Sequence, residues 1–146
     1  MKGIDILSYK FIFKGKEYDL NEEKLIGFYN DEENPVKDMD INKIIDILKN
    51  SDEDEVDFDR EYYEVRCKKC MVKKEEGQDY YEYLEFNFYM FTKDSNYVIS
   101  NISKEYEGLT YNKLLREQRV DNSYIVTIIV CRNCGVYSVV IEELEI

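Results

Sequence analysis

The four cysteines of this chain are the residues whose type and spacing can do chemistry, and they form two Cys-x-x-Cys pairs. The pairs are Cys67-Lys-Lys-Cys70 and Cys131-Arg-Asn-Cys134, and Gly135 follows the second pair. Two thiolates one tight turn apart can both reach a metal ion at about 2.3 Å. Two such knuckles supply a tetrahedron of four sulfur ligands and leave no open position for a substrate. The spacing therefore predicts a single structural Zn²⁺ site.

Three other roles for the same cysteines remain open. A redox Cys-x-x-Cys usually begins a helix, whose dipole lowers the thiol pKa, whereas strand-like sequence follows both pairs here. Iron or an iron–sulfur cluster uses the same ligands, and sequence does not separate it from zinc. Disulfides or simply buried thiols are the third possibility, but a reducing cytosol favours thiolate ligands over disulfides.

The residue after each pair distinguishes the two knuckles. This position commonly adopts a positive φ, which glycine accepts without strain. Gly135 meets the requirement and Met71 does not, so the second knuckle has the better sequence. Basic residues also lie inside or beside the knuckles. They can compensate the negative charge of four thiolates around a divalent ion, or they can contact a phosphate or an acidic partner; they are Arg66, Lys68, Lys69 and Arg132.

The composition argues against an enzyme. The chain has no histidine, which removes the most common general base, the Ser-His-Asp triad and any metal site that contains histidine. No glycine-rich phosphate loop or Gly-x-Ser-x-Gly motif is present. The sequence therefore predicts a non-enzymatic protein with no catalytic residues.

Negative charge is concentrated in one part of the chain. The formal net charge is −12, and residues 21–59, here called the acidic segment, hold 14 acidic and 4 basic side chains. We expect this segment to bind a basic protein partner. An acidic protein repels nucleic acid at long range, so DNA or RNA binding is disfavoured. A nucleic-acid-binding ribbon, the alternative, would need five basic residues on one surface: Lys68, Lys69, Lys73, Lys74 and Arg132.

Size and hydropathy predict one cytoplasmic domain over residues 1–146. A chain of this length buries enough surface for a hydrophobic core without help from a metal. No stretch approaches the roughly 20 apolar residues that a membrane span needs. The start, Met1-Lys-Gly-Ile-Asp-Ile, lacks the layout of a signal peptide. We therefore expect no membrane association.

The hydrophobic pattern predicts an α+β fold with a mainly antiparallel sheet and two or three short helices. Residues 4–13 and 17–20 read as a hairpin, and Asn21 can cap a short helix that ends near residue 29. Asp40 can cap a helix with isoleucine or leucine at positions 41, 44, 45 and 48, and Thr110 can cap a third. Strands are expected at 58–66, 80–91, 97–102, 124–130 and 136–141, the last two as central strands.

The arrangement resembles the zinc-ribbon superfamily, in which each Cys-x-x-Cys lies at a hairpin tip. The 60 residues between Cys70 and Cys131 exceed the spacing of simple ribbons, so the resemblance implies a ribbon with a large insertion. The whole chain also resembles an uncharacterised family of bacterial proteins of about this length, from anaerobic low-GC Gram-positive species, with two Cys-x-x-Cys motifs. That resemblance implies zinc binding and brings no activity with it.

Overall fold

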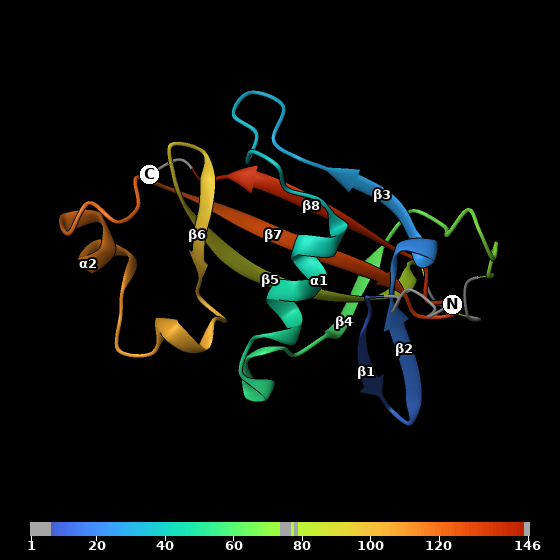
Figure 1. The fold of residues 1–146 in the computed structure, drawn as a ribbon. Helices are drawn as coiled ribbons and strands as arrows, with labels where there is room; N and C mark the ends of the chain where they lie inside the picture. Colours follow the sequence, from blue (N-terminus) through green and yellow to red (C-terminus); the bar gives the residue numbers. More distant parts are fainter. Residues whose placement is uncertain (1–6, 74–76, 78, 145–146) are drawn as a thin grey trace, which may run out of the picture.

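The computed structural model describes residues 7–73, 77 and 79–144. The fold is α+β, as predicted (Figure 1). Its helices are α1 (Ile41–Lys49) and α2 (Tyr111–Arg116), with short 3₁₀ turns at Glu22–Lys24, Glu53–Glu55 and Lys104–Tyr106. Its strands are β1 (Tyr9–Phe13), β2 (Lys16–Leu20), β3 (Leu25–Tyr29), β4 (Asp59–Tyr63), β5 (Tyr81–Lys93), β6 (Asn96–Ser100), β7 (Asn122–Cys131) and β8 (Tyr137–Glu143). Within the described ranges, no helix has the length and apolar character to cross a membrane.

The main sheet has the strand order β3-β8-β7-β5-β4, and β6 pairs with the far end of β5. All of these pairings are antiparallel except that between β3 and β8. The strands β7 and β8 therefore occupy the centre of the sheet, as their apolar sequences predicted. The hairpin of β1 and β2 forms a separate two-stranded sheet beside this one (Figure 1).

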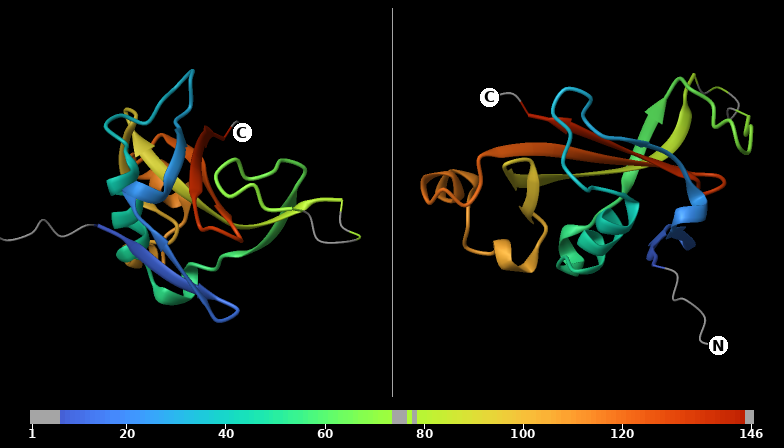
Figure 2. Two further views of the ribbon diagram at one scale, coloured as in Figure 1. Left: turned by 90° about the vertical axis from the view of Figure 1, so that its right-hand side faces the viewer. Right: turned by 45° about the horizontal axis from the view of Figure 1, so that its top comes forward.

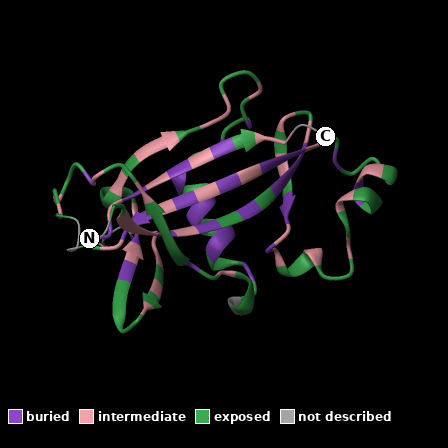
Figure 3. Cartoon of the chain, turned by 180° about the vertical axis from the view of Figure 1, so that it is seen from behind, coloured by how far each residue is buried: buried purple, intermediate pink, exposed green. Residues whose placement is uncertain are grey.

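One face of the main sheet is packed and the other is open. Leu84, Phe86, Phe88 and Met90 alternate along β5 and are all buried, which confirms the predicted half-buried strand. Helix α1 lies on the side of this buried face (Figure 2). Seen from the opposite side, the strands alternate between buried and half-buried residues and no helix covers them (Figure 3). The fold thus has a single main core between α1 and the sheet.

Helix α1 begins and packs as its sequence predicted. The Asp40 side chain accepts a hydrogen bond from the Lys43 amide at 3.0 Å, which is the expected N-cap. The buried face of the helix consists of Ile41, Ile44, Ile45, Ile47 and Leu48. Helix α2 is likewise capped by Thr110, whose Oγ1 accepts from the Lys113 amide at 3.1 Å. Both predicted caps are confirmed.

The predicted helix from Asn21 to about residue 29 is wrong. Asn21 does cap a turn, because its side chain accepts a hydrogen bond from the Lys24 amide at 3.0 Å. That turn is a single 3₁₀ turn, and the following residues form β3. β3 runs parallel to β8, with Phe28 opposite Val139, and Phe28 packs against the main core. The same cap suits one turn or a longer helix, so pairing with a distant strand decides the outcome.

Two strand boundaries also differ from the prediction. The strand expected at 58–66 ends at Tyr63, and residues 64–66 already belong to the turn that leads to the first cysteine pair. The first hairpin begins at Tyr9, while residues 4–6 of the predicted strand lie outside the described residues.

We expect replacement of Asp31 by asparagine to destabilise the fold by about 1 kcal/mol at neutral pH. The Asp31 carboxylate accepts hydrogen bonds from the backbone amides of Glu33, Asn34 and Glu143, so it ties its loop to the end of β8. The first of the hydrogen bonds by effect, from Glu143, and the other two lower the Asp31 pKa below its ordinary value of 3.8. The contribution is therefore complete above pH 4 or so and is lost as the pH falls through the lowered folded-state pKa.

Urea unfolding of wild type and Asp31→Asn at pH 7 and pH 3 measures this effect. The difference between the two proteins should shrink at the lower pH. Glu32→Gln is the matched control, since it removes the same charge from the same loop but no hydrogen bond found among the described residues. An equal loss in both variants would show that charge alone matters.

Candidate metal centre

The sheet topology brings the two cysteine pairs to one place. Cys67 and Cys70 lie in the connection from β4 to β5, and Cys131 and Cys134 lie in the loop from β7 to β8. β5 pairs with β7 along most of its length, and Tyr83 at the start of β5 lies opposite Cys131. Both connections therefore end at the same edge of the sheet. Antiparallel pairing of two hairpins thus replaces the short spacing of a simple ribbon.

All four predicted cysteines meet in one cluster. Their Sγ atoms lie within 4.8 Å of one another, and all four cysteines are free thiols. The Sγ atoms of Cys67 and Cys134 are 3.7 Å apart, and those of Cys70 and Cys131 are 3.8 Å apart. In a tetrahedron with metal–sulfur bonds of about 2.3 Å, neighbouring sulfurs are about 3.8 Å apart. The donor set and its spacing therefore fit a metal ion bound by four sulfurs.

The two knuckles have the same backbone geometry. The amide of Met71 donates to the Cys67 carbonyl at 3.0 Å, and the amide of Gly135 donates to the Cys131 carbonyl at 3.0 Å. Both residues have a positive φ, 52° at Met71 and 81° at Gly135. The sequence suggested that only Gly135 fits this turn, but Met71 adopts the same left-handed region. The closed knuckle imposes that conformation on a residue that does not favour it.

Amide groups in and after the knuckles point at the sulfurs. The amide of Val136 donates to the Cys134 thiol, and the amide of Val72 donates to the Cys70 thiol at the equivalent position. The amide of Asn133 donates to the thiol of Cys131. Such amide donors stabilise negative charge on sulfur, which is the form that binds metals.

We expect Met71→Gly to stabilise the protein by up to about 1 kcal/mol, and Gly135→Ala to destabilise it by about 1 kcal/mol. Glycine at position 71 relieves the strain of a positive φ, although the greater freedom of the unfolded chain offsets part of the gain. An alanine Cβ at position 135 would lie 3.7 Å from the Tyr18 ring, an ordinary contact, so its cost comes from the backbone. Thermal unfolding of the two single variants and the wild type measures both signs. If both variants shift the melting temperature in the same direction, the knuckles do not share this geometry under the conditions of the measurement.

Burial and hydrogen bonding separate the four thiols in acidity. Burial is the main influence on Cys131 and raises its pKa to about 12. Burial also raises the pKa of Cys70, but hydrogen bonds from the Asn133 side chain, the Val72 amide and two cysteines outweigh it and lower the pKa to about 6. Cys70 is therefore the first to ionise. A metal ion must displace protons from the more buried thiols, which makes binding dependent on pH.

The basic side chains near the cluster hold the knuckle backbones. Arg66 donates from Nε to the Val72 carbonyl at 3.0 Å, within the first knuckle region. Arg132 donates to the Tyr18 hydroxyl at 2.6 Å, and this hydroxyl donates to the Arg132 carbonyl at 2.6 Å. Lys16 donates to the carbonyls of Arg132 and Asn133. Their positive charge also lies close to the cluster, as charge compensation requires.

Sequence reasoning missed Lys16 and Tyr18, which come from the β1–β2 hairpin. They lie more than one hundred positions before the knuckle that they contact, and no local pattern marks them. Asn133, the donor to Cys70, was also missed. Its position inside a knuckle is the one signal that could have identified it, because side chains in such turns lie next to the sulfurs.

The features expected of the alternative roles are distributed differently. Neither pair begins a helix, since each lies in a tight turn at the end of the sheet. The basic residues required for a nucleic-acid-binding surface are split between two depressions. Lys68 lines an apolar groove of about 280 Å³ on the open face of the sheet, whereas Lys73 and Arg132 line a separate cavity. Lys74 lies outside the described residues.

Comparison with known proteins identifies the family of the chain. No curated protein and no solved structure matches it. A family described as "Protein of unknown function (DUF3785)" matches residues 9–146, a range that includes all four clustered cysteines. The chain therefore belongs to the DUF3785 family.

Proposed function

We propose that this protein is a small zinc-binding interaction module, in which four cysteines hold one structural Zn²⁺ ion and no reaction is catalysed. The observation that carries the proposal is the meeting of four Sγ atoms at tetrahedral spacing. Cys67, Cys70, Cys131 and Cys134 would hold the ion, which would link the β4–β5 connection to the β7–β8 loop. Zinc is preferred over iron as the occupant because it favours tetrahedral thiolate sites and does not change oxidation state.

The proposed partner is a basic protein that binds the acidic segment. Every acid of this segment whose burial is described is exposed, except Asp31. Among the described residues, the ion pairs join Lys10 to Glu17, Arg60 to Glu82 and Arg119 to Glu117, and none involves an acid of the segment. The negative charge of the segment is therefore available to an outside partner.

The densest acidic run lies next to a fixed anchor in the core. Phe58 is 5% exposed and stacks on Phe11, with ring centroids 4.1 Å apart. Asp54, Glu55 and Asp57 lie just before this anchor and are exposed. Because the anchor holds one end of the run on the protein body, these carboxylates present their charge from a defined place. This supports binding through the run itself.

A pulldown from a lysate of the source organism, at low and high salt, tests this partner. The triple variant Asp54→Asn, Glu55→Gln, Asp57→Asn should lose most of the protein that the wild type retains at low salt. The matched control is Glu105→Gln, Glu107→Gln, Glu117→Gln, which removes the same charge from exposed sites around α2. The control should retain the partner. Retention that resists both salt and neutralisation of the run would refute an electrostatic partner.

A further inference from the structure

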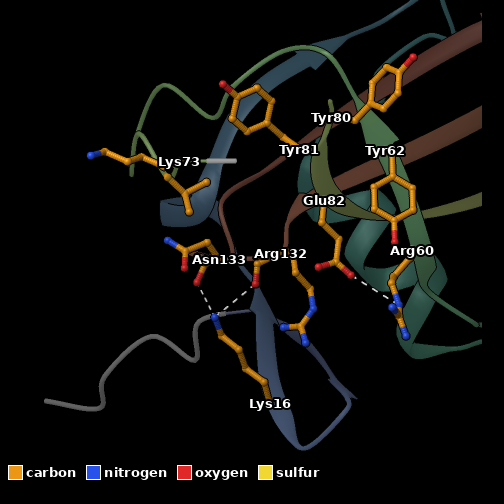
Figure 4. A pocket seen from close by; sticks show the side chains of 10 residues that line it. Lys16, Arg60, Tyr62, Lys73, Tyr80, Tyr81, Glu82, Arg132 and Asn133 are labelled. Carbon is orange, nitrogen blue, oxygen red and sulfur yellow. Dashed lines mark hydrogen bonds and ion pairs between the residues drawn. The ribbon is translucent and has the colours of Figure 1, made fainter. Parts of the chain in front are cut away.

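A second depression, distinct from the cysteine cluster, lies beside the second knuckle. Its volume is about 470 Å³, and residues from four separate parts of the chain line it (Figure 4). The basic side chains in its wall are Lys16 of β2, Arg60 of β4, Lys73 after the first knuckle and Arg132 of the second knuckle. One acid, Glu82, lies among them. We call this depression the basic cavity.

The charge of the basic cavity opposes that of the protein. Four basic side chains against one acid give its wall a net positive charge, while the whole chain carries −12. Glu82 pairs with Arg60, whose Nε lies 3.5 Å from a Glu82 carboxylate oxygen, and so offsets only part of this charge. In a protein that repels anions at long range, a local excess of cations in a concave site favours an anionic ligand at contact distance.

Arg132 is held in place and keeps an unused donor. Its guanidinium donates to the Tyr18 hydroxyl and lies 5.1 Å from the centroid of the Phe13 ring. Its Nε is buried and has no hydrogen-bond partner among the described residues. Figure 4 shows the Arg132 side chain between those of Lys16 and Arg60. A buried N–H without an acceptor is unfavourable, and a fixed guanidinium is well suited to the oxygens of a phosphate.

Aromatic side chains complete the wall. Tyr62 and Tyr80 are 48% and 45% exposed and line the cavity together with Tyr81. A partly exposed tyrosine ring offers a flat apolar face on which an unsaturated ring can stack. Cations for phosphate and rings for stacking therefore occur in one cavity of small-molecule size.

We propose that the basic cavity binds a small phosphorylated ligand that carries a flat ring, the chemistry of a mononucleotide. Arg60, Arg132 and Lys73 bind the phosphate, and the tyrosines contact the ring. Glu82 weakens binding, because it faces the same anion. The proposal does not depend on the identity of the metal, since no sulfur lines the cavity.

Isothermal titration of the metal-loaded protein at low ionic strength tests the proposal with three probes: adenosine monophosphate, inorganic phosphate and adenosine. The nucleotide should bind roughly tenfold or more tightly than either part alone. Adenosine that binds as tightly as the nucleotide would overturn the phosphate contacts, and inorganic phosphate that does so would overturn the ring contacts. No measurable binding of any probe would overturn the site.

Three variants locate the binding. Arg60→Gln and Lys73→Gln should each weaken nucleotide binding roughly tenfold, and Glu82→Gln should strengthen it severalfold. Lys113→Gln, an exposed lysine of α2, is the matched control and should leave the affinity unchanged. Equal losses in Lys113→Gln and Lys73→Gln, or no response to Glu82→Gln, would overturn the assignment. Metal content and circular dichroism of each variant separate lost binding from a lost fold.

Discussion

Replacement of Cys131 by serine is expected to abolish tight metal binding and to lower the free energy of unfolding by on the order of 4 kcal/mol. Cys131 is 3% exposed and ends β7 opposite Tyr83, so its sulfur links the knuckles at the point where the two hairpins pair. A hydroxyl is a poor zinc ligand, and it leaves three sulfurs around the ion. Urea unfolding of metal-loaded wild type and variant measures the difference.

The variant should nevertheless remain folded at 25 °C, because the main core between α1 and the sheet does not include the cysteine cluster. Chelator-treated wild type is the matched control, and its stability should fall to that of the variant. The variant itself should not respond to the chelator. A chelator effect of equal size in both proteins would mean that the stabilising ion binds elsewhere.

The second large effect is expected in α1, the helix that covers the buried face of the sheet. Ile44 is 0% exposed and faces the core, so Ile44→Ala removes buried apolar atoms and leaves a cavity. Such a change typically destabilises a protein by about 2–5 kcal/mol. Asn42→Ala, on the exposed face of the same helix, should change stability by less than about 0.5 kcal/mol. Thermal or urea unfolding of both variants provides the comparison.

Equal stabilities of the two helix variants would contradict the packing of α1 on the sheet. The Ile44 and Cys131 effects also test different parts of the molecule. Chelation should lower the stability of Ile44→Ala by about as much as it lowers that of the wild type, because the two sites do not share contacts.

The elements that sequence predicted well are those specified by their own residues. Asp40 and the isoleucines after it specify α1 through a cap and a helical period, and both act within a few residues. The alternation from Leu84 to Met90 specifies the buried face of β5 in the same way. The predicted sheet, its antiparallel character and the two helices follow from such local signals.

The elements that sequence did not predict depend on contacts between distant residues. β3 was expected to be helical, and its pairing with β8 across the length of the chain makes it a strand. Met71 adopts a positive φ because its knuckle must close, and nothing in its side chain favours that conformation. Lys16 and Tyr18 reach the second knuckle only because the first hairpin packs beside it.

The cysteine cluster combines both kinds of information. The spacing within each pair identified Cys67, Cys70, Cys131 and Cys134 as ligand candidates, and the structure places all four together. What joins one pair to the other is the register of β5 on β7, which the sequence does not specify directly. The donor set was therefore predictable, whereas its supporting residues from the first hairpin were not.

Zinc K-edge X-ray absorption of the purified protein, with metal quantified per chain, tests the four-sulfur site most directly. The proposal predicts one zinc ion per chain and a shell of four sulfur atoms at about 2.3 Å, without nitrogen or oxygen ligands. A shell that contains oxygen or nitrogen, or a protein that takes up no zinc while its four thiols are reduced, would contradict it.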